Sequence, residues 1–355
     1  MLYFLCRDCI PFQETQKSEK ESNSCLSHFR RRGLDWRGVI GLVDKDKKRK
    51  IILDVDPGVD DAFAIAMAAY EETLEILAIH TVAGNVTLEH TTKNARGFAK
   101  LLGLDVPIAK GASEPLVFEP FYAAEVHGEN GFGDIELDDL APLSSKTAME
   151  SYVDILSNTE EKVTIVATGP LTNVALLLKS YPHLKEKIEG ISLMGGGLKG
   201  GNTTSAGEFN FFYDPHAAHI VLNSELPIVM ASLDATEQSE FRQKDAERLK
   251  REGGAVGELL HDISQAALTF NAEANAIDFM SLHDVIAVLY LVQPNLFTTK
   301  DAIVHVAYDS GVMRGFSHAD VRKRAEGEPN AKVMVGLDKE AFLDYVLKKI
   351  IQANQ

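Results

Sequence analysis

The chain has 355 residues, of which 45% are hydrophobic and 25% charged, and its net charge is −16 at pH 7. This length suffices for one large domain or two ordinary ones. The acidic balance argues against a nucleic-acid binder, which needs a basic face, and against attachment to anionic lipid. No apolar run approaches the roughly 20 residues of a membrane span, and three Cys exclude a disulfide scaffold. We therefore expect a soluble, cytoplasmic protein, by default an enzyme of small neutral or cationic ligands.

The first 50 residues differ from the rest of the chain. They carry 12 Lys and Arg against 7 Asp and Glu, a net charge of +5, whereas residues 51–355 carry −21. Because the segment lacks helical or strand periodicity, we expect a disordered extension at 1–50 and a single domain at 51–355. Four of its residues have zinc-ribbon-like spacing: Cys6, Cys9, Cys25 and His28. A chance pattern is the stronger interpretation, since few apolar residues surround them. A separate hypothesis is that the native chain begins further on, near Val43.

Beyond residue 50, predicted strands and helices alternate. The first strand is the β-branched run at 51–55, after which Pro57 and Gly58 turn the chain and Asp60 or Asp61 caps a helix. Further strands are expected at 74–82, 106–109, 163–167, 191–194 and 227–231, and helices at 88–102, 171–180 and 215–223. Helices dominate 240–291, and strands near 302–308 and 332–335 precede a last helix at 339–351. These repeated units predict an α/β fold, one large domain with a mostly parallel central sheet flanked by helices.

In such sheets, ligands bind at the carboxyl ends of the strands. The first strand ends in a run with four carboxylates in eight residues, namely Asp54, Asp56, Asp60 and Asp61. Carboxylates this close repel one another unless a cation lies among them, and oxygen donors suit Ca²⁺ or Mg²⁺ better than zinc. Helix capping accounts for Asp60 and Asp61, which leaves a metal-binding or catalytic role as the favoured interpretation of Asp54 and Asp56.

Other strand ends carry amides and carboxylates that suit sugar hydroxyls. They include Asn85, Asn173, Asn202, Glu208 and Asn210. A His-Asp pair at 283–284 opens an apolar helix, but alone it is a weak signal, because an Asp at a helix start is usually a cap. The glycines at 195, 197 and 200 match a dinucleotide fingerprint, yet the residues after them read as loop instead of helix. No phosphate loop is present either, so a phosphorylated ligand is disfavoured.

Taken together, these motifs strongly resemble the inosine–uridine nucleoside hydrolase family, which cleaves the N-glycosidic bond of ribonucleosides. The family's DxDPGxDDA string occupies 54–62. Further motifs of the family follow in the same order along the chain: TVxGN at 81–85, HGxxGxG at 127–133, TGPLTN at 168–173, MGGG at 194–197, EFN at 208–210 and HD at 283–284. An ordered set over residues 50–350 is far more specific than any single motif. The resemblance implies a Ca²⁺-dependent hydrolase that forms ribose and free base in nucleoside salvage or catabolism, as a homodimer or homotetramer.

The resemblance also implies roles for individual residues. Asp56 binds calcium and is the general base toward the attacking water, while His283 is the acid that protonates the leaving base. The implied calcium ligands are Asp56, Asp61, the carbonyl of Thr168, and Asp284. The implied ribose contacts are Asp60, Asn85, Met194, Asn202, Glu208 and Asn210. His127 belongs to a Gly-rich loop that can close over the substrate.

Base specificity stays open in the sequence. Phe270 and Phe279 are candidate base contacts, with a core role for Phe270 an equal alternative. Phe132 replaces the usual Leu of the Gly-rich loop, and we expect it to alter a hydrophobic lid.

Two rival functions are disfavoured. A phosphatase of the haloacid dehalogenase type would use Asp54 as nucleophile, Asp56 as acid–base group and Mg²⁺, but the chain lacks a basic phosphate grip. A calcium-dependent sugar-binding module without catalysis is the non-enzymatic alternative, against which the retention of Asp56 and His283 argues.

Overall fold

The computed structural model describes residues 47–309, 311–320, 322 and 327–354. The four residues with zinc-like spacing, Cys6, Cys9, Cys25 and His28, lie outside these described residues, as does the expected extension apart from its last four residues. The first strand begins at Arg49, two residues before the expected start. No helix in the described part of the chain combines the length and the apolar character that a membrane crossing requires.

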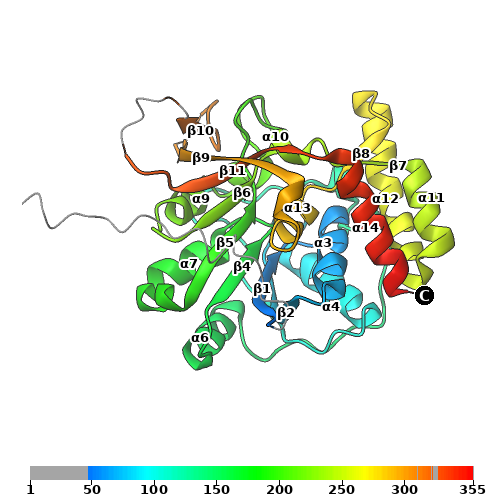
Figure 1. The fold of residues 1–355 in the computed structure, drawn as a ribbon, viewed down its shortest axis with the longest axis horizontal. Helices are drawn as coiled ribbons and strands as arrows, with labels where there is room; N and C mark the ends of the chain where they lie inside the picture. Colours follow the sequence, from blue (N-terminus) through cyan, green and yellow to red (C-terminus); the bar gives the residue numbers. More distant parts are fainter. Residues whose placement is uncertain (1–46, 310, 321, 323–326, 355) are drawn as a thin grey trace, which may run out of the picture. The chain divides into compact units, whose positions relative to one another are not determined.

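A nine-stranded sheet forms the centre of the described chain (Figure 1). Its strands are β1 (Arg49–Val55), β2 (Leu74–Thr81), β3 (Ile108–Lys110), β4 (Val163–Ala167), β5 (Ile188–Met194), β6 (Ile228–Ala231), β9 (Phe297–Val306), β10 (Ser317–Asp320) and β11 (Ala331–Leu337). They lie in the order β10-β9-β11-β6-β5-β4-β1-β2-β3. Neighbours from β11 to β3 pair in parallel, and β9 is antiparallel to both of its neighbours. The predicted mostly parallel sheet is confirmed.

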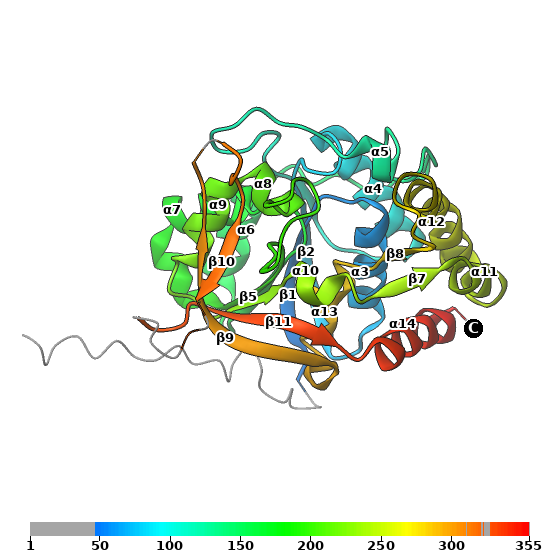
Figure 2. The same ribbon diagram turned by 90° about the horizontal axis from the view of Figure 1, so that it is seen from above.

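Helices cover both faces of this sheet (Figures 1 and 2). They are α3 (Val59–Tyr70), α4 (Leu88–Leu101), α5 (Ala124–His127), α6 (Ala148–Asn158), α7 (Thr172–Ser180), α8 (Phe209–Tyr213), α9 (Pro215–Leu222), α10 (Leu233–Thr236), α11 (Gln243–Glu252), α12 (Gly254–Asn275), α13 (Val285–Leu289) and α14 (Lys339–Ala353), with 3₁₀ turns at Pro182–Lys187 and Pro294–Leu296. A small antiparallel pair, β7 (Glu240–Arg242) and β8 (Phe279–Ser281), lies within the region where helices were expected to dominate. Three residues are too few to show alternation, so the sequence pattern misses both strands.

Strand β1 separates two hydrophobic cores. Ile51, Leu53 and Val55 face one core, which includes α3, α12, α13 and α14, whereas Ile52 faces the other, which includes α6, α7 and α9. Successive side chains of a strand point to opposite faces. Asp54 therefore points toward the α6 and α7 layer.

The site lies where the chain changes its direction of progress across the sheet. From β1 the chain moves outward to β2 and β3, and then returns to β4 on the other side of β1. Loops that leave two such strands diverge and open a crevice at the carboxyl edge of the sheet. The segment after β1 and the segment after β4 meet at this point, where the Thr168 N–H donates to the Asp54 carbonyl at 3.0 Å.

Candidate active site

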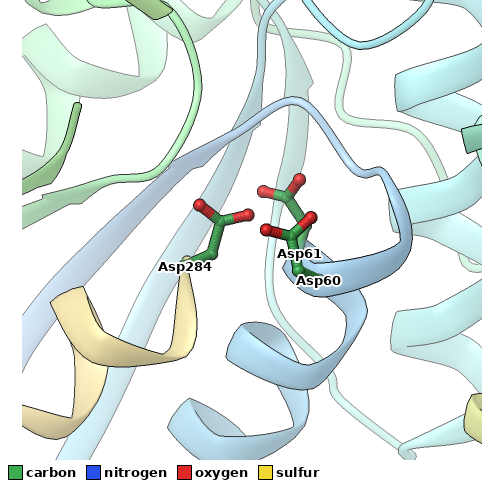
Figure 3. Close-up of side chains that lie close together, drawn as sticks. All are labelled: Asp60, Asp61 and Asp284. Atoms are coloured by element: carbon green, nitrogen blue, oxygen red, sulfur yellow. The ribbon is translucent and has the colours of Figure 1, made fainter. Parts of the chain in front are cut away.

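Three buried carboxylates converge at the start of two helices. Asp60 and Asp61 lie in the first turn of α3, and Asp284 directly precedes α13, which packs against α3. Figure 3 shows the three side chains pointing toward one another. Each offers an oxygen within 4.8 Å of the others. The cluster therefore concentrates negative charge in a small space shielded from water.

Burial raises the pKa of these carboxyl groups. It raises that of Asp60 to about 7, with a further contribution from the charge of Asp61, and it raises the pKa values of Asp56, Asp61 and Asp284 as well. Carboxylates so placed cannot all be ionised at neutral pH unless a cation compensates them. Carboxylate oxygens together with the nearby Thr168 carbonyl are donors that suit a hard divalent cation. The residues present thus fit a metal ion.

Asp56 is held at the edge of this cluster by backbone groups. The Asn85 N–H donates to Asp56 Oδ2 at 2.7 Å. Gly84 and Gly169 lie against the same carboxylate, so that a Cβ atom on either would come within 2.0 or 2.6 Å of its oxygens. Asp56 lies outside the 4.8 Å cluster, which instead includes Asp60, the residue that the resemblance assigns to the ribose.

Asp54 is held by hydrogen bonds to two side chains in the protein interior. Tyr152 donates its hydroxyl to Asp54 Oδ2 at 2.8 Å, and Asn173 Nδ2 donates to both carboxylate oxygens at 3.2 Å. The side chain is 1% exposed and does not line the cavity described below. The expected metal-binding or catalytic role of Asp54 is therefore wrong: alternation along β1 turns this side chain away from the site.

A cavity of about 420 Å³ opens above the acidic cluster, a size within the usual range for small-molecule sites. Eleven of the twelve residues that the sequence nominates line it: Asp56, Asp60, Asn85, His127, Thr168, Met194, Asn202, Glu208, Asn210, His283 and Asp284. The twelfth, Asp61, lies beneath and accepts a hydrogen bond from the Thr168 hydroxyl at 2.7 Å. Among the described residues that line the cavity, five are Asp or Glu and none is Lys or Arg.

The loop before α8 supplies the amide and carboxylate groups of one wall. Glu208, which caps α8, accepts hydrogen bonds from the N–H groups of Gly196 and Asn210 at 2.8 and 3.0 Å. Asn210 Nδ2 donates to the Thr168 carbonyl at 2.7 Å. Asn202 Oδ1 accepts from the Phe209 N–H at 2.9 Å. These bonds connect the ends of β4 and β5 and fix the wall beside the acidic cluster.

Two histidines line the cavity. His127 Nδ1 accepts the Val59 N–H at 3.1 Å; since a backbone N–H can only donate, the ring carries its proton on Nε2. Burial, with a smaller contribution from His283, lowers the pKa of His127 to about 4. His283 Nδ1 lies 2.8 Å from Thr236 Oγ1, and burial lowers the pKa of His283 to about 4.

Aromatic side chains also line the cavity. Phe121, Tyr122 and Phe209 contribute to it and were not nominated from the sequence, although the run of aromatic residues at 118–122 in a polar loop is a usable signal. Phe270 lines the cavity and is not among the buried core residues, which argues against the core interpretation; its contact with the base stays a prediction. Phe279 lies beneath Arg242, with 5.2 Å from guanidinium carbon to ring centroid.

Phe132 is fully buried and packs edge-on against Phe98. It belongs to the core, so the expectation that it alters a lid is wrong.

The fold and the site together are those of a protein that binds a small molecule at the edge of a mostly parallel sheet: buried carboxylates lie where the strand order reverses, and a cavity opens above them. The family model described as inosine-uridine preferring nucleoside hydrolase matches residues 51–344. The chain belongs to this family, and it is a hydrolase that acts on ribonucleosides. The recognition made from the sequence motifs is thus confirmed.

Individual relatives agree with this assignment. The chain is 39% identical over 306 residues to the pyrimidine-specific ribonucleoside hydrolase RihA of Enterobacter sp. (strain 638), covering 85% of this chain and 97% of the relative. RihA of Escherichia coli (strain SMS-3-5 / SECEC) is 39% identical over 304 residues, covering 84% and 97%. Among solved structures, the purine-preferring ribonucleoside hydrolase from Gardnerella vaginalis has a TM-score of 0.80 at 32% identity, covering 86% of this chain and 99% of that one.

Proposed function

We propose that the chain hydrolyses the N-glycosidic bond of ribonucleosides in a calcium-dependent reaction, releasing ribose and free base in nucleoside salvage or catabolism. The observation that carries the proposal is the buried carboxylate cluster under a cavity of suitable size. Asp56, Asp61, Asp284 and the Thr168 carbonyl would hold the ion, since all four offer hard oxygen donors. When bound, calcium would offset the charge of the cluster and make the attacking water more acidic.

Asp56 is the proposed general base. Its carboxylate lines the cavity, and the Asn85 N–H holds one of its oxygens in place at 2.7 Å, so that it can accept a proton from a water in the cavity. Six residues that line the same cavity are the proposed ribose contacts: Asp60, Asn85, Met194, Asn202, Glu208 and Asn210. As the bond to the base breaks, positive charge develops on the ribose ring, and anionic and amide groups stabilise this charge.

The leaving base is proposed to lie against the aromatic part of the cavity. His283 lines the same cavity and would supply the proton that the departing base requires. His127 presents Nε2–H from the Gly-rich loop, so it would donate a hydrogen bond to the substrate. One relative is described as pyrimidine-specific and one structural neighbour as purine-preferring, so we propose ribonucleosides as the substrate class.

Further parts of the proposal concern the protein as a whole. We place catalysis in the domain at 51–355 and treat 1–50 as an extension outside it. We propose a cytoplasmic homodimer or homotetramer, because relatives of this family usually assemble in this way. The net charge of −16 supports the expectation that neither nucleic acid nor a membrane is a partner.

Two comparisons test the proposed chemistry. Asp56→Asn should lower kcat for a hydrolysed nucleoside by about 10²- to 10⁴-fold, the usual contribution of a general base, whereas Asp139→Asn, at a carboxylate that is 83% exposed, should leave it unchanged. A nucleoside 5′-phosphate should be a far poorer substrate than its nucleoside, because the cavity presents carboxylates to the phosphate. Turnover of p-nitrophenyl phosphate without any release of ribose from nucleosides would favour the phosphatase.

A further inference from the structure

Thr236 occupies one edge of the His283 ring. It is the last residue of α10, is fully buried, and places Oγ1 2.8 Å from His283 Nδ1. Within the described part of the chain, this hydroxyl has no second hydrogen-bond partner, and neither does His283 Nε2. Thr236 does not line the cavity, whereas His283 does. The threonine therefore contacts the histidine at a ring edge that lies away from the cavity.

The small β7–β8 sheet brings these two residues together. The chain between α10 and β7 accepts a backbone hydrogen bond at the Ser239 carbonyl from the Leu282 N–H, at 3.2 Å. Beyond this bond the two strands continue as an antiparallel pair, with Glu240 opposite Ser281. His283 directly follows Leu282, so its backbone is held beside the end of α10. The contact is thus built by two segments about 45 residues apart in the sequence.

We propose that Thr236 is a positioning residue for His283, whose hydroxyl keeps Nδ1 occupied and so directs Nε2 toward the leaving base. This inference rests on the proposed function of the cavity. A hydroxyl can accept a hydrogen bond from a protonated Nδ1 and can donate one to an unprotonated Nδ1. Nδ1 is therefore partnered whichever of the two atoms donates, and the opposite edge of the ring, which carries Nε2, is left free to face the cavity.

The proton balance of the step is simple. The donating form of His283 carries a proton on each ring nitrogen; when the N-glycosidic bond breaks, its electron pair leaves with the base, and the Nε2 proton passes to the base. The ring is left neutral with its remaining proton on Nδ1, where Thr236 Oγ1 accepts the hydrogen bond. A later exchange with solvent returns the proton to Nε2. The threonine neither gains nor loses a proton.

The neighbouring histidine shows that this arrangement differs from simple ring packing. His127 Nδ1 receives a backbone N–H, which cannot accept a hydrogen bond and so allows only one tautomer of the neutral ring. His283 has a hydroxyl at the equivalent nitrogen, and a hydroxyl can either donate or accept the hydrogen bond. Of the two rings, the geometry thus equips His283 for proton transfer and His127 for hydrogen-bond donation.

The test compares substrates that differ in their need for a proton. Thr236→Val preserves the shape of the side chain but removes the hydroxyl. We expect it to lower kcat for a nucleoside by about 10- to 100-fold, as for loss of a hydrogen bond to a charged group. With p-nitrophenyl riboside, whose leaving group departs as a stable anion, kcat should change less than about threefold. Thr236→Ser, which keeps the hydroxyl, should restore most of the nucleoside activity.

Three results separate the outcomes. In the double variant with His283→Ala, Thr236→Val should cause no further loss, since the threonine acts through that ring. Thr164→Val is the matched control, because this fully buried threonine on β4 bonds to Glu189 and does not line the cavity; it should leave the ratio of the two substrates unchanged. Equal losses on both substrates would overturn the inference. If the unmodified protein cleaves neither substrate, the proposed function itself fails.

Discussion

Gly84 lies so close to Asp56, the proposed general base, that a side chain at this position would collide with the carboxylate. The absence of a side chain there lets the loop after β2 approach Asp56 closely enough for the Asn85 N–H to bond its carboxylate. In the TVxGN segment, Gly84 thus leaves room for Asp56, and Asn85 supplies the N–H that bonds the Asp56 carboxylate. Asp56 owes its position to neighbours in sequence-distant loops, which no pattern around residue 56 reveals.

We predict that Gly84→Ala lowers kcat by on the order of 10²-fold. The new Cβ would lie 2.0 Å from Asp56 Oδ2, so the carboxylate or the loop must move. A displacement of about 1 Å costs on the order of 10²-fold in rate at a catalytic group. Gly336→Ala is the control, since its Cβ would meet Thr298 at an ordinary 3.4 Å. Steady-state kinetics would contradict the account if Gly84→Ala retained full kcat.

His80 is a second residue whose environment has a measurable effect. It is fully buried, with Nε2 hydrogen-bonded to Ser151 Oγ at 2.9 Å. Nδ1 lies 4.0 Å from Asp54 Oδ2, which is too far for a hydrogen bond. Burial lowers the pKa of His80 to about 3, so the ring is neutral and the two residues do not form an ion pair.

We predict that His80 makes the fold sensitive to acid. The unfolded histidine titrates near 6.5 and the folded one near 3, so between these values the unfolded chain binds the extra proton. Its contribution is complete above pH 6.5 and is lost as the pH falls, by up to about 1.4 kcal/mol per pH unit. Between pH 6.5 and 5, His80→Gln should lose about 2 kcal/mol less unfolding free energy than the unmodified protein.

Urea unfolding at the two pH values measures this difference. His305→Gln, at an exposed position of β9, should follow the unmodified protein. Parallel losses in all three proteins would show that His80 is not the source of the acid sensitivity.

At the scale of elements, Asp214 connects three segments that surround the cavity. As the N-cap of α9 it accepts the Ala217 N–H at 3.0 Å. Its other oxygen accepts the Thr172 hydroxyl at the start of α7 at 2.8 Å, and the Leu116 N–H at 2.9 Å. The Leu116 loop continues to Phe121 in the cavity wall. One buried carboxylate thus ties two helices to a loop that shapes the site.

We predict that Asp214→Ala destabilises the fold by about 3 kcal/mol, because three donors lose their acceptor at roughly 1 kcal/mol each. Asp338→Ala is the comparison, since Asp338 caps α14 through a single bond to the Ala341 N–H and should contribute about 1 kcal/mol. Chemical denaturation measures both. Equal losses for the two variants would contradict the role assigned to Asp214.

The elements that the sequence predicts well are the long ones with clear periodicity. The helix expected at 88–102 and the strand expected at 163–167 match the observed bounds to within one residue. The βα alternation indicated the carboxyl edge of the sheet, and the family resemblance nominated the twelve residues of which eleven line the cavity. Strands β7 and β8, of three residues each, depend on mutual pairing for which the local sequence gives no signal. The contact between Thr236 and His283 depends on that pairing and was missed for the same reason.

At the scale of the whole molecule, the chain has a net charge of −16, and three of the carboxylates that contribute to it are buried together at the proposed metal site. Asp60, Asp61 and Asp284 are each less than 10% exposed. Carboxylates at the surface are solvated by water, but these three depend on a cation or a bound proton. The stability of the folded chain should therefore be linked to metal concentration.

We predict that calcium raises the melting temperature by several degrees at saturating concentration, because it binds only the folded protein. Asp61→Asn should lose most of this shift, since it removes one charge and one ligand of the proposed site. Asp139→Asn, at an exposed carboxylate, should respond as the unmodified protein does. Thermal melts of the three proteins, each with calcium and with chelator, would contradict the proposed site if all shifted equally.

The most direct test of the account is the release of ribose from uridine, cytidine, inosine and adenosine, measured as reducing sugar before and after removal of metal. The account predicts that the calcium-loaded protein forms ribose from at least one nucleoside, that chelation stops the reaction, and that added calcium restores it. Failure of the folded, calcium-loaded protein to release ribose from any of the four would contradict the central claim.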